Sequence, residues 1–326
     1  MSSAVVSPRA RLLGLVCAAV LLAGCSTANA VGTARTDSTR TTVPSAASNT
    51  STVDTAFSSA ALRAIDPCGL LDQQTVSQLG TSAQPAAQDE IDSCSADLTD
   101  GKGKDLGVSV SIGGDLASST PTGTIGGLPV QEQSDSTECA EDLITQQRPA
   151  TGIEVRVTNN SASTCLFARQ LAGLVVNRIR TNAPHRRNGV NSLVLIDPCD
   201  TIDDATVQNL TAVGPEKSVE GLFKCDWIGG DYDLGVEFIL DSNPKDDNIE
   251  GTPQPVDVGV PAYAFPSNDV YPSCDVKWQV RALGQGSDTG EVVDVQFGDV
   301  LGGSLDPCTQ AEAAAKVVAT KVPRPS

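Results

Sequence analysis

Ten cysteines dominate the chemistry that this chain could perform. Two lie near its start, Cys17 in an apolar stretch and Cys25 at the end of a Leu-Ala-Gly-Cys tetrapeptide. The other eight fall into two sets of four, and the first two members of each set are 26 residues apart: Cys68, Cys94, Cys139 and Cys165, then Cys199, Cys225, Cys274 and Cys308. Zinc sites usually use closely spaced cysteines, whereas an even number of widely spaced cysteines is typical of disulfides in exported proteins. We predict disulfides and no metal site.

Each set of four cysteines allows three pairings, and the sequence alone excludes none of them. We favour first to second and third to fourth in each set. A disulfide that closes a loop of this length stabilises a fold by about 3 kcal/mol in the chain-entropy description. Aromatic residues make up only 3% of the chain, and small aliphatic cores are marginally stable, so covalent links have a physical use here.

The remaining chain offers few catalytic residues. Its single histidine, His185, lies among proline, arginine and asparagine residues, which is typical of a solvated linker. Neither a Gly-x-Ser-x-Gly nucleophile elbow nor a phosphate-binding loop occurs. The acidic run at 241–250 fails the calcium-loop template, because Lys245 and Asp246 stand where an oxygen ligand and a glycine are needed. We predict a non-enzymatic protein without cofactors; the alternatives are an envelope-polymer hydrolase with a carboxylate pair, or a structural envelope protein.

Residues 1–24 are predicted to be a lipoprotein signal peptide. Arg9 and Arg11 give a positively charged start, and residues 12–22 are apolar but too few to span a bilayer. The tetrapeptide that ends at Cys25 resembles a bacterial lipobox, which implies cleavage before Cys25 and a diacylglycerol on its thiol. An ordinary secretory leader followed by a chance cysteine is the alternative. The anchor predicts attachment to the outer face of the cell membrane.

Lipidated Cys25 opens a segment, residues 25–60, that is rich in serine, threonine and alanine. Such a composition buries too little apolar surface to offset the loss of chain entropy, so we predict a disordered tether that reaches roughly 30 Å. The formal net charge of the whole chain is −18, which disfavours binding to nucleic acid. The one basic cluster is Arg178, Arg180, Arg186 and Arg187, and we interpret it as a solvated linker.

The elements that carry the cysteines occur twice, with an offset of 131 residues between Cys68 and Cys199. Asp72 and Asp203 are good helix N-caps, and Asp306-Pro307 starts a last helix. Apolar residues at helical spacing predict helices over 171–179 and 311–322. Alternating apolar residues predict these strands: 106–110, 125–130, 153–157, 234–238, 258–263, 274–280 and 292–297.

This order predicts an α+β fold of two tandem disulfide-stapled modules, at 61–181 and 193–326, joined by a linker at 182–192. Each module should be an antiparallel sheet of four to five strands, flanked by an N-terminal and a C-terminal helix. Aromatic residues gather in the second module, where they could form a surface for an envelope protein or a small-molecule ligand: Trp227, Tyr232, Tyr263, Tyr271 and Trp278. The alternative, which we favour, is that these side chains fill the second core.

The tetrapeptide, the tether, the Asp-Pro-Cys motif with its helix, and the run Cys225-Asp226-Trp227 resemble a family of actinobacterial cell-envelope lipoproteins. The domain shared by that family is classed as one of unknown function. The resemblance covers nearly all of residues 61–326 and is strongest in the second module. The first module departs from it, because Ser95 and Ala96 replace Asp226 and Trp227. The resemblance implies a cell-envelope location, an α+β fold and kinship with small extracytoplasmic sensor-like domains. It supplies no catalytic residues.

Overall fold

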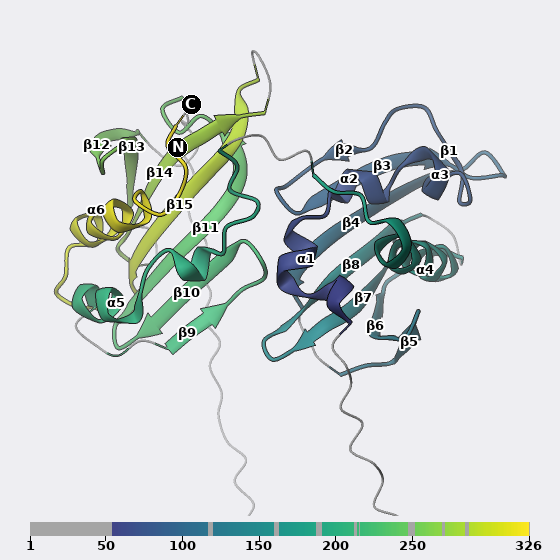
Figure 1. Cartoon of the computed structure of the whole chain (residues 1–326), viewed down its shortest axis with the longest axis horizontal. Coiled ribbons are helices and arrows are strands. Elements are labelled where there is room, and N and C mark those ends of the chain that lie inside the picture. The colour runs from purple at the N-terminus through teal and green to yellow at the C-terminus, as the bar shows by residue number, and fades with distance from the viewer. Residues whose placement is uncertain are drawn as a thin grey trace, which may run out of the picture. The chain divides into compact units, whose positions relative to one another are not determined.

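The computed structural model describes residues 54–116, 120–159, 163–186, 191–211, 214, 216–246, 252–268, 271–283 and 287–325. The predicted signal peptide, Cys25 and most of the predicted tether lie outside these ranges. Helices and two sheets make up the described part of the chain, and strands dominate (Figure 1). We refer to residues 54–186 as the first half and to residues 191–325 as the second half.

The sheet of the first half has eight strands, and every pairing in it is antiparallel. The order is β1-β3-β4-β8-β7-β6-β5, and β2 pairs with the same edge of β3 as β1 does. The strands are β1 (Thr81–Ser82), β2 (Ala87–Gln88), β3 (Ser93–Thr99), β4 (Asp105–Asp115), β5 (Gly123–Ile125), β6 (Leu128–Ser134), β7 (Glu138–Gln147) and β8 (Ala150–Thr158).

The sheet of the second half has seven strands, again all antiparallel. The order is β12-β13-β14-β15-β11-β10-β9, which is the order of the first sheet when β3 is matched to β10 and β8 to β15. The strands are β9 (Glu216–Val219), β10 (Lys224–Gly229), β11 (Tyr232–Ser242), β12 (Gln254–Asp257), β13 (Pro261–Ser267), β14 (Ser273–Ala282) and β15 (Thr289–Asp299). Both sheets therefore have more strands than the four or five expected from the sequence.

Two of the predicted strands are in fact hairpin turns. Within 125–130 the chain reverses at Gly126 and Gly127, whose φ angles are +56° and +85°, and β5 and β6 form on either side. Within 258–263, Gly259 has a φ of +93° and separates β12 from β13. Glycine adopts these backbone angles without a steric penalty, so alternating apolar residues around it mark a turn between two strands.

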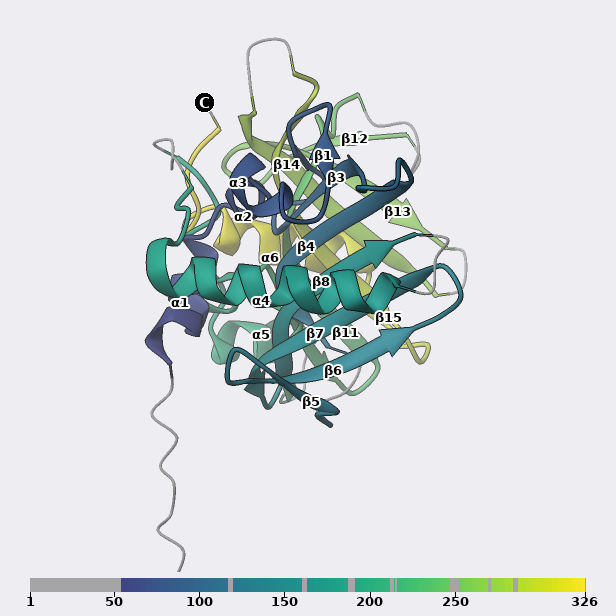
Figure 2. The ribbon, with the colours of Figure 1, turned by 90° about the vertical axis from the view of Figure 1, so that its right-hand side faces the viewer.

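Short helices precede each sheet, and a longer helix follows each sheet. They are a 3₁₀ turn η1 (Thr55–Phe57), α1 (Ser59–Arg63), α2 (Pro67–Leu70), α3 (Gln73–Val76), α4 (Thr164–Asn182), a 3₁₀ turn η2 (Pro198–Asp200), α5 (Asp204–Thr211) and α6 (Pro307–Val318). Helix α4 packs across β7 and β8, as Figure 2 shows, and α6 packs on β14 and β15. None of the described helices meets the length and hydropathy needed to cross a membrane.

Two expectations about the ends of the first half need correction. The segment 54–60, which we assigned to a disordered tether, forms η1 and the start of α1. Phe57 is buried there, and the guanidinium of Arg180 lies 5.2 Å from the centre of its ring. An aromatic ring that gains a core contact offsets the entropy of ordering its neighbours, so one phenylalanine is enough to start the fold earlier than composition suggested.

The basic cluster at the join is largely structural rather than a solvated linker. Arg178 pairs with Asp72 at 2.9 Å, and the Nε of Arg186 donates to the carbonyl of Ile65 at 2.9 Å. His185 is exposed and forms an isolated β-bridge with Ile65. Arg187 lies outside the described residues. Guanidinium groups hold chain ends here because each presents several donors to carbonyl and carboxylate oxygens.

Four disulfides link helices to strands. The pairs are Cys68–Cys94, Cys139–Cys165, Cys199–Cys225 and Cys274–Cys308, which is the first-to-second and third-to-fourth pairing that we favoured. In each half the first pair joins the Asp-Pro-Cys turn to the first long-range strand, β3 or β10. The second pair joins the closing helix to β7 or β14. Each helix is therefore covalently held on one face of its own sheet.

Candidate functional site

The most site-like feature of the first half is a pocket of about 430 Å³ between α2, α3, β3 and the segment that joins β1 to β2. We call it the Ala96 pocket. Its lining residues are Cys68, Leu71, Asp72, Gln73, Val76, Ser82, Ala83, Gln84, Pro85, Ala86 and Ala96. Sites for small organic ligands commonly measure 300–1,000 Å³ and combine apolar walls with a few polar groups. The Ala96 pocket falls within this description.

Local sequence fixes the helical wall of the pocket. Asp66 caps α2 by accepting from the amide of Cys68 at 3.1 Å, and Pro67 occupies the first helical position. Asp72 caps α3 by accepting from the amide and the hydroxyl of Thr75, each at 2.9 Å. The disulfide from Cys68 to Cys94 then holds α2 against β3. These contacts are local in sequence, so the wall forms wherever the Asp-Pro-Cys segment is held on the sheet.

The opposite wall exists because the edge strand of the first sheet is interrupted. Ser82 pairs with Leu98, and Ala87 pairs with Ser95, so the four residues 83–86 stand opposite only Ala96 and Asp97. The extra residues form a loop that leaves the edge of β3, and the hydroxyl of Ser82 donates to the carbonyl of Gln84 within that loop. Such an excess of residues on one strand bends it away from its partner. The pocket opens behind this bend.

The second half has a different structure at the matching positions. Its edge strand β9 is uninterrupted, with Val219 opposite Cys225 and Lys217 opposite Trp227. Trp227 takes the place that Ala96 has in β3, two residues after the disulfide cysteine and on the same sheet face. By the same register Lys217 corresponds to Ala86. Two large side chains of the second half are therefore alanines in the first, and both alanines line the pocket.

The pocket is mainly apolar inside and polar at its mouth. Leu71, Val76 and Ala96 are buried, whereas Gln73 and Gln84 are exposed. Among the described residues that line the pocket, Asp72 is the one charged group. Its carboxylate already accepts from Thr75 and pairs with Arg178 on α4. A carboxylate engaged in this way stabilises α3 and is poorly placed to act as a catalytic acid or base.

The predicted aromatic surface of the second half is not assembled as one exposed patch. Trp227 and Trp278 are 0% and 1% exposed, and Tyr232 is also buried, with its hydroxyl accepting from the amides of Ser304 and Leu305. Tyr263 is half-buried, and Tyr271 is exposed. The two indoles and Tyr232 thus belong to the interior, as in the core-filling alternative that we favoured from strand alternation.

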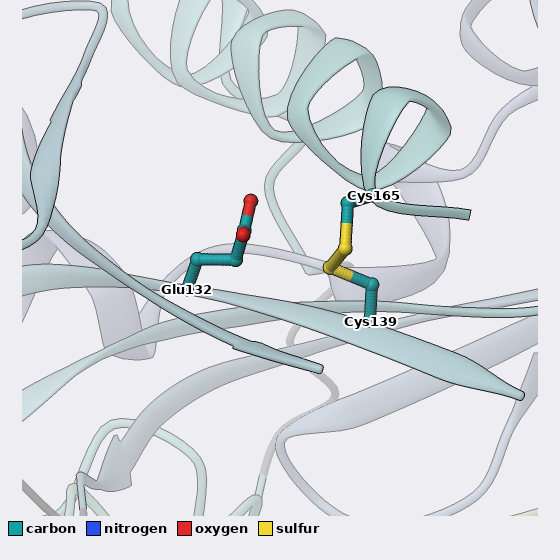
Figure 3. A group of neighbouring side chains, drawn as sticks. All are labelled: Glu132, Cys139 and Cys165. Carbon is teal, nitrogen blue, oxygen red and sulfur yellow. A yellow bond between two sulfur atoms is a disulfide. The ribbon is translucent and has the colours of Figure 1, made fainter. Parts of the chain in front are cut away.

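The structure brings two carboxylates together at the face of the first sheet that α4 covers. Glu132 on β6 lies directly opposite Glu141 on β7, and Arg169 on α4 forms ion pairs with both, at 3.2 Å from Nε to the Oε1 of Glu141. Burial, and then the neighbouring Glu132, raise the pKa of Glu141 to about 7. Figure 3 shows Glu132 beside the Cys139–Cys165 disulfide. The two sulfurs are bonded to each other, so neither is a thiolate that could ligate a metal.

The raised pKa of Glu141 has a definite effect on stability. In the unfolded chain this carboxyl loses its proton near its ordinary value of 4.5, whereas in the fold it keeps the proton until about pH 7. Below the unfolded value both states are protonated and Glu141 contributes nothing to the pH dependence. Between these pH values the folded state binds the extra proton, so stability falls as pH rises, and above the folded value the full destabilisation is present.

The four disulfides indicate an oxidising, extracytoplasmic environment. Comparison with known proteins gives no match to a family model, to a curated protein or to a solved structure. The resemblance to actinobacterial lipoproteins therefore stays a prediction. The residues themselves carry the functional argument.

Sequence reasoning did not find the Ala96 pocket, although one signal of it was present. Aligning the two copies shows that Ala96 replaces Trp227, which we interpreted as a loss of function in the first copy. The second replacement, of Lys217 by Ala86, depends on strand register and becomes visible only in the folded chain. Together the two replacements turn an apparent loss into a cavity.

Proposed function

We propose that this protein is a lipid-anchored, extracytoplasmic binding protein that presents two tandem copies of one domain outside the cell. In this proposal the first copy binds a small molecule in the Ala96 pocket, and the second copy is a filled version of the same domain. The pocket is the single observation that carries the binding function. Its size and its apolar interior with a polar mouth are those of a ligand site.

The tandem organisation is supported by topology. The two sheets share one strand order, and each half places its two disulfides between the same pairs of elements. Asp72 and Asp203 cap the matching helices α3 and α5 by accepting from the amides of Thr75 and Thr206. Agreement in strand order, covalent links and caps at one sequence offset is what a duplicated domain would produce.

The anchored location is supported by the amino terminus and by the disulfides. Charged start, short apolar stretch and the tetrapeptide ending at Cys25 occur in the order of a lipoprotein signal. A chain that crosses the membrane through such a signal meets an oxidising compartment, in which four disulfides can persist. A tether before residue 54 would then hold the folded part clear of a membrane surface that repels its net charge of −18.

Catalysis by paired carboxylates is the alternative, and Glu132 with Glu141 is the pair that would perform it. The raised pKa of Glu141 suits a general acid. However, Glu141 is only 1% exposed, and Arg169 holds both carboxylates from above. Neither residue lines the Ala96 pocket. We therefore assign the pair a structural role in seating α4.

Two experiments test the proposal. In a bacterium that processes lipoproteins, the wild-type chain should partition with membranes and Cys25→Ser should be released; membrane retention of the variant would refute the anchor. For the pocket, hexanol and cyclohexanol are titrated into the isotopically labelled mature chain. Backbone amide shifts should concentrate on residues 68–76 and 82–96, with dissociation constants on the order of 10 mM or below for so few atoms. Shifts elsewhere only, or no shifts with any apolar probe, would refute the binding function.

A further inference from the structure

The second half shows what kind of group the Ala96 pocket is shaped to hold. Trp227 is completely buried at the position of Ala96, and the Nζ of Lys217 lies 5.6 Å from the centre of its ring. The same ammonium donates to the carbonyl of Cys199 at 3.3 Å. An indole with an ammonium over its face is a favourable cation–π arrangement. In the first half both side chains end at their Cβ atoms.

The walls around this position are nearly the same in the two halves. Leu71 corresponds to Ile202, and Val76 corresponds to Val207; all four are buried. The disulfide from Cys68 to Cys94 corresponds to the one from Cys199 to Cys225, with Cα separations of 5.1 and 5.2 Å. The floor and the helical wall that hold an indole in one half are therefore retained in the other, where the indole is missing.

We propose that the Ala96 pocket binds a planar aromatic group of about indole size, whose ring takes the place that Trp227 has in the second half. This inference rests on the proposed binding function and specifies its ligand class. A flat ring gains contacts on both faces between the helical wall and the loop 83–86. A saturated ring of similar mass is thicker and fits the same slot less closely.

The orphaned N–H of Trp227 refines the class. Its Nε1 has no hydrogen-bond partner among the residues that the structure describes. The position thus accepts the ring for its shape and not for a donor. Ligands without a ring N–H, such as 1-methylindole, are expected to bind as well as indole.

The missing lysine gives the ligand's substituent a preferred charge. Lys217 donates to the carbonyl of Cys199, and the matching carbonyl of Cys68 accepts from the amide of Leu71 at 3.1 Å, which leaves its second lone pair. Asp72 lines the same pocket, and the net charge of the chain is −18. An aromatic ring with a short cationic arm would therefore replace both Trp227 and Lys217, whereas an anionic arm would be disfavoured.

The experiment compares five probes on the full mature chain by isothermal titration and by backbone amide shifts. The probes are indole, 1-methylindole, tryptamine, indole-3-acetate and cyclohexylmethanol. We expect one site for indole with a dissociation constant on the order of 0.1–1 mM, and an equal value for 1-methylindole. Tryptamine should bind about threefold or more tightly than indole, and indole-3-acetate at least about threefold more weakly. Cyclohexylmethanol should be at least about fivefold weaker than indole.

A matched pair of variants locates the site. Ala96→Trp places the ring covalently in the pocket and should weaken indole binding by at least about tenfold. Thr99→Trp adds the same side chain to β3 at an exposed position and should leave binding unchanged. If Ala96→Trp does not fold, the amide shifts of Leu71, Val76 and Ala96 in the wild-type chain give the same information.

The outcomes separate the ligand class from the binding function. If cyclohexanol and cyclohexylmethanol occupy the pocket and indole does not, the aromatic class is refuted while the binding function stands. If indole binds equally well to Ala96→Trp, the ring does not occupy this pocket and the inference fails. If no apolar probe shifts the pocket amides, both proposals fail together.

Discussion

Removing the indole of Trp227 should open in the second half the cavity that the first half already has. The substitution is Trp227→Ala, at a side chain that is fully buried between η2, α5 and β9 on the inner face of β10. Register places Lys217 opposite it, so the substitution also removes a cation–π contact. The variant is thus a second-half copy of the Ala96 arrangement, except that its edge strand is uninterrupted.

The magnitude follows from the area that leaves water when the fold forms. A tryptophan side chain buries roughly 150–250 Å², which at about 25 cal/mol per Å² corresponds to about 4–6 kcal/mol. The unfolded chain already covers part of this area, which lowers the figure to about 3–5 kcal/mol, the range usual for Trp→Ala in cores. The lost contact with Lys217 adds about 0.5–1 kcal/mol. We expect the free energy of unfolding of the second half to fall by about 4 kcal/mol.

The assay is urea denaturation of the mature chain with and without indole. Trp278 reports the second half by its fluorescence once Trp227 is removed, and these two are the only tryptophans. Indole at ten times its dissociation constant should restore about 1.4 kcal/mol to the variant by mass action. Trp227→Phe keeps a ring and is the control, with an expected loss of about 1–2 kcal/mol. A loss below about 1 kcal/mol for Trp227→Ala would show that the indole is not packed as we describe, and a loss that indole cannot reverse would show that the two positions are not equivalent.

Three further predictions concern the frame around the pocket. Replacing Cys68 and Cys94 together by alanine should lower the free energy of unfolding by about 3–4 kcal/mol and abolish indole binding, since the disulfide closes a 26-residue separation and holds α2; unchanged melting on adding reductant to the wild type would contradict this. Asp72→Ala should lower stability by about 1–2 kcal/mol in thermal unfolding, whereas Asp72→Asn, which keeps the cap and loses the ion pair with Arg178, should change it by less than about 1 kcal/mol. Glu141→Gln should remove about 1–2 kcal/mol of stability loss between pH 5 and 8, measured by urea unfolding at each pH; an unchanged pH profile would refute the buried, protonated carboxyl.

The predictable parts of the fold are those set by short-range chemistry. Asp66, Asp72, Asp203 and Asp306 all lie where a carboxylate can reach amides two or three residues ahead, and each does so in the fold. Strand alternation placed Trp278 on an inward face for the same reason, because side chains on a strand point alternately to the two sides. The tandem arrangement of the cysteines likewise anticipated the pairing.

The errors arose where one local signal has two readings. Apolar alternation continues through a hairpin turn, so Gly126 and Gly259 were placed within strands when they separate them. The arginines at the join look solvated in sequence, yet their partners, Asp72 and the carbonyl of Ile65, are more than 100 residues away along the chain. Long-range partners of this kind leave no trace in composition.

The sequence by itself determined that the chain has eight paired cysteines in two equivalent sets, capped helices after each Asp-Pro motif, and strands that alternate around an aliphatic interior. Only the tertiary structure decided that Ala96 borders a cavity. An alanine on an inward face is compatible with a closed core or an open pocket, and the choice depends on what the neighbouring strand does. Here residues 83–86 leave the edge of β3, and Ala86 stands where the second half has Lys217. Cavities are set by the packing of several segments at once, which no single segment encodes.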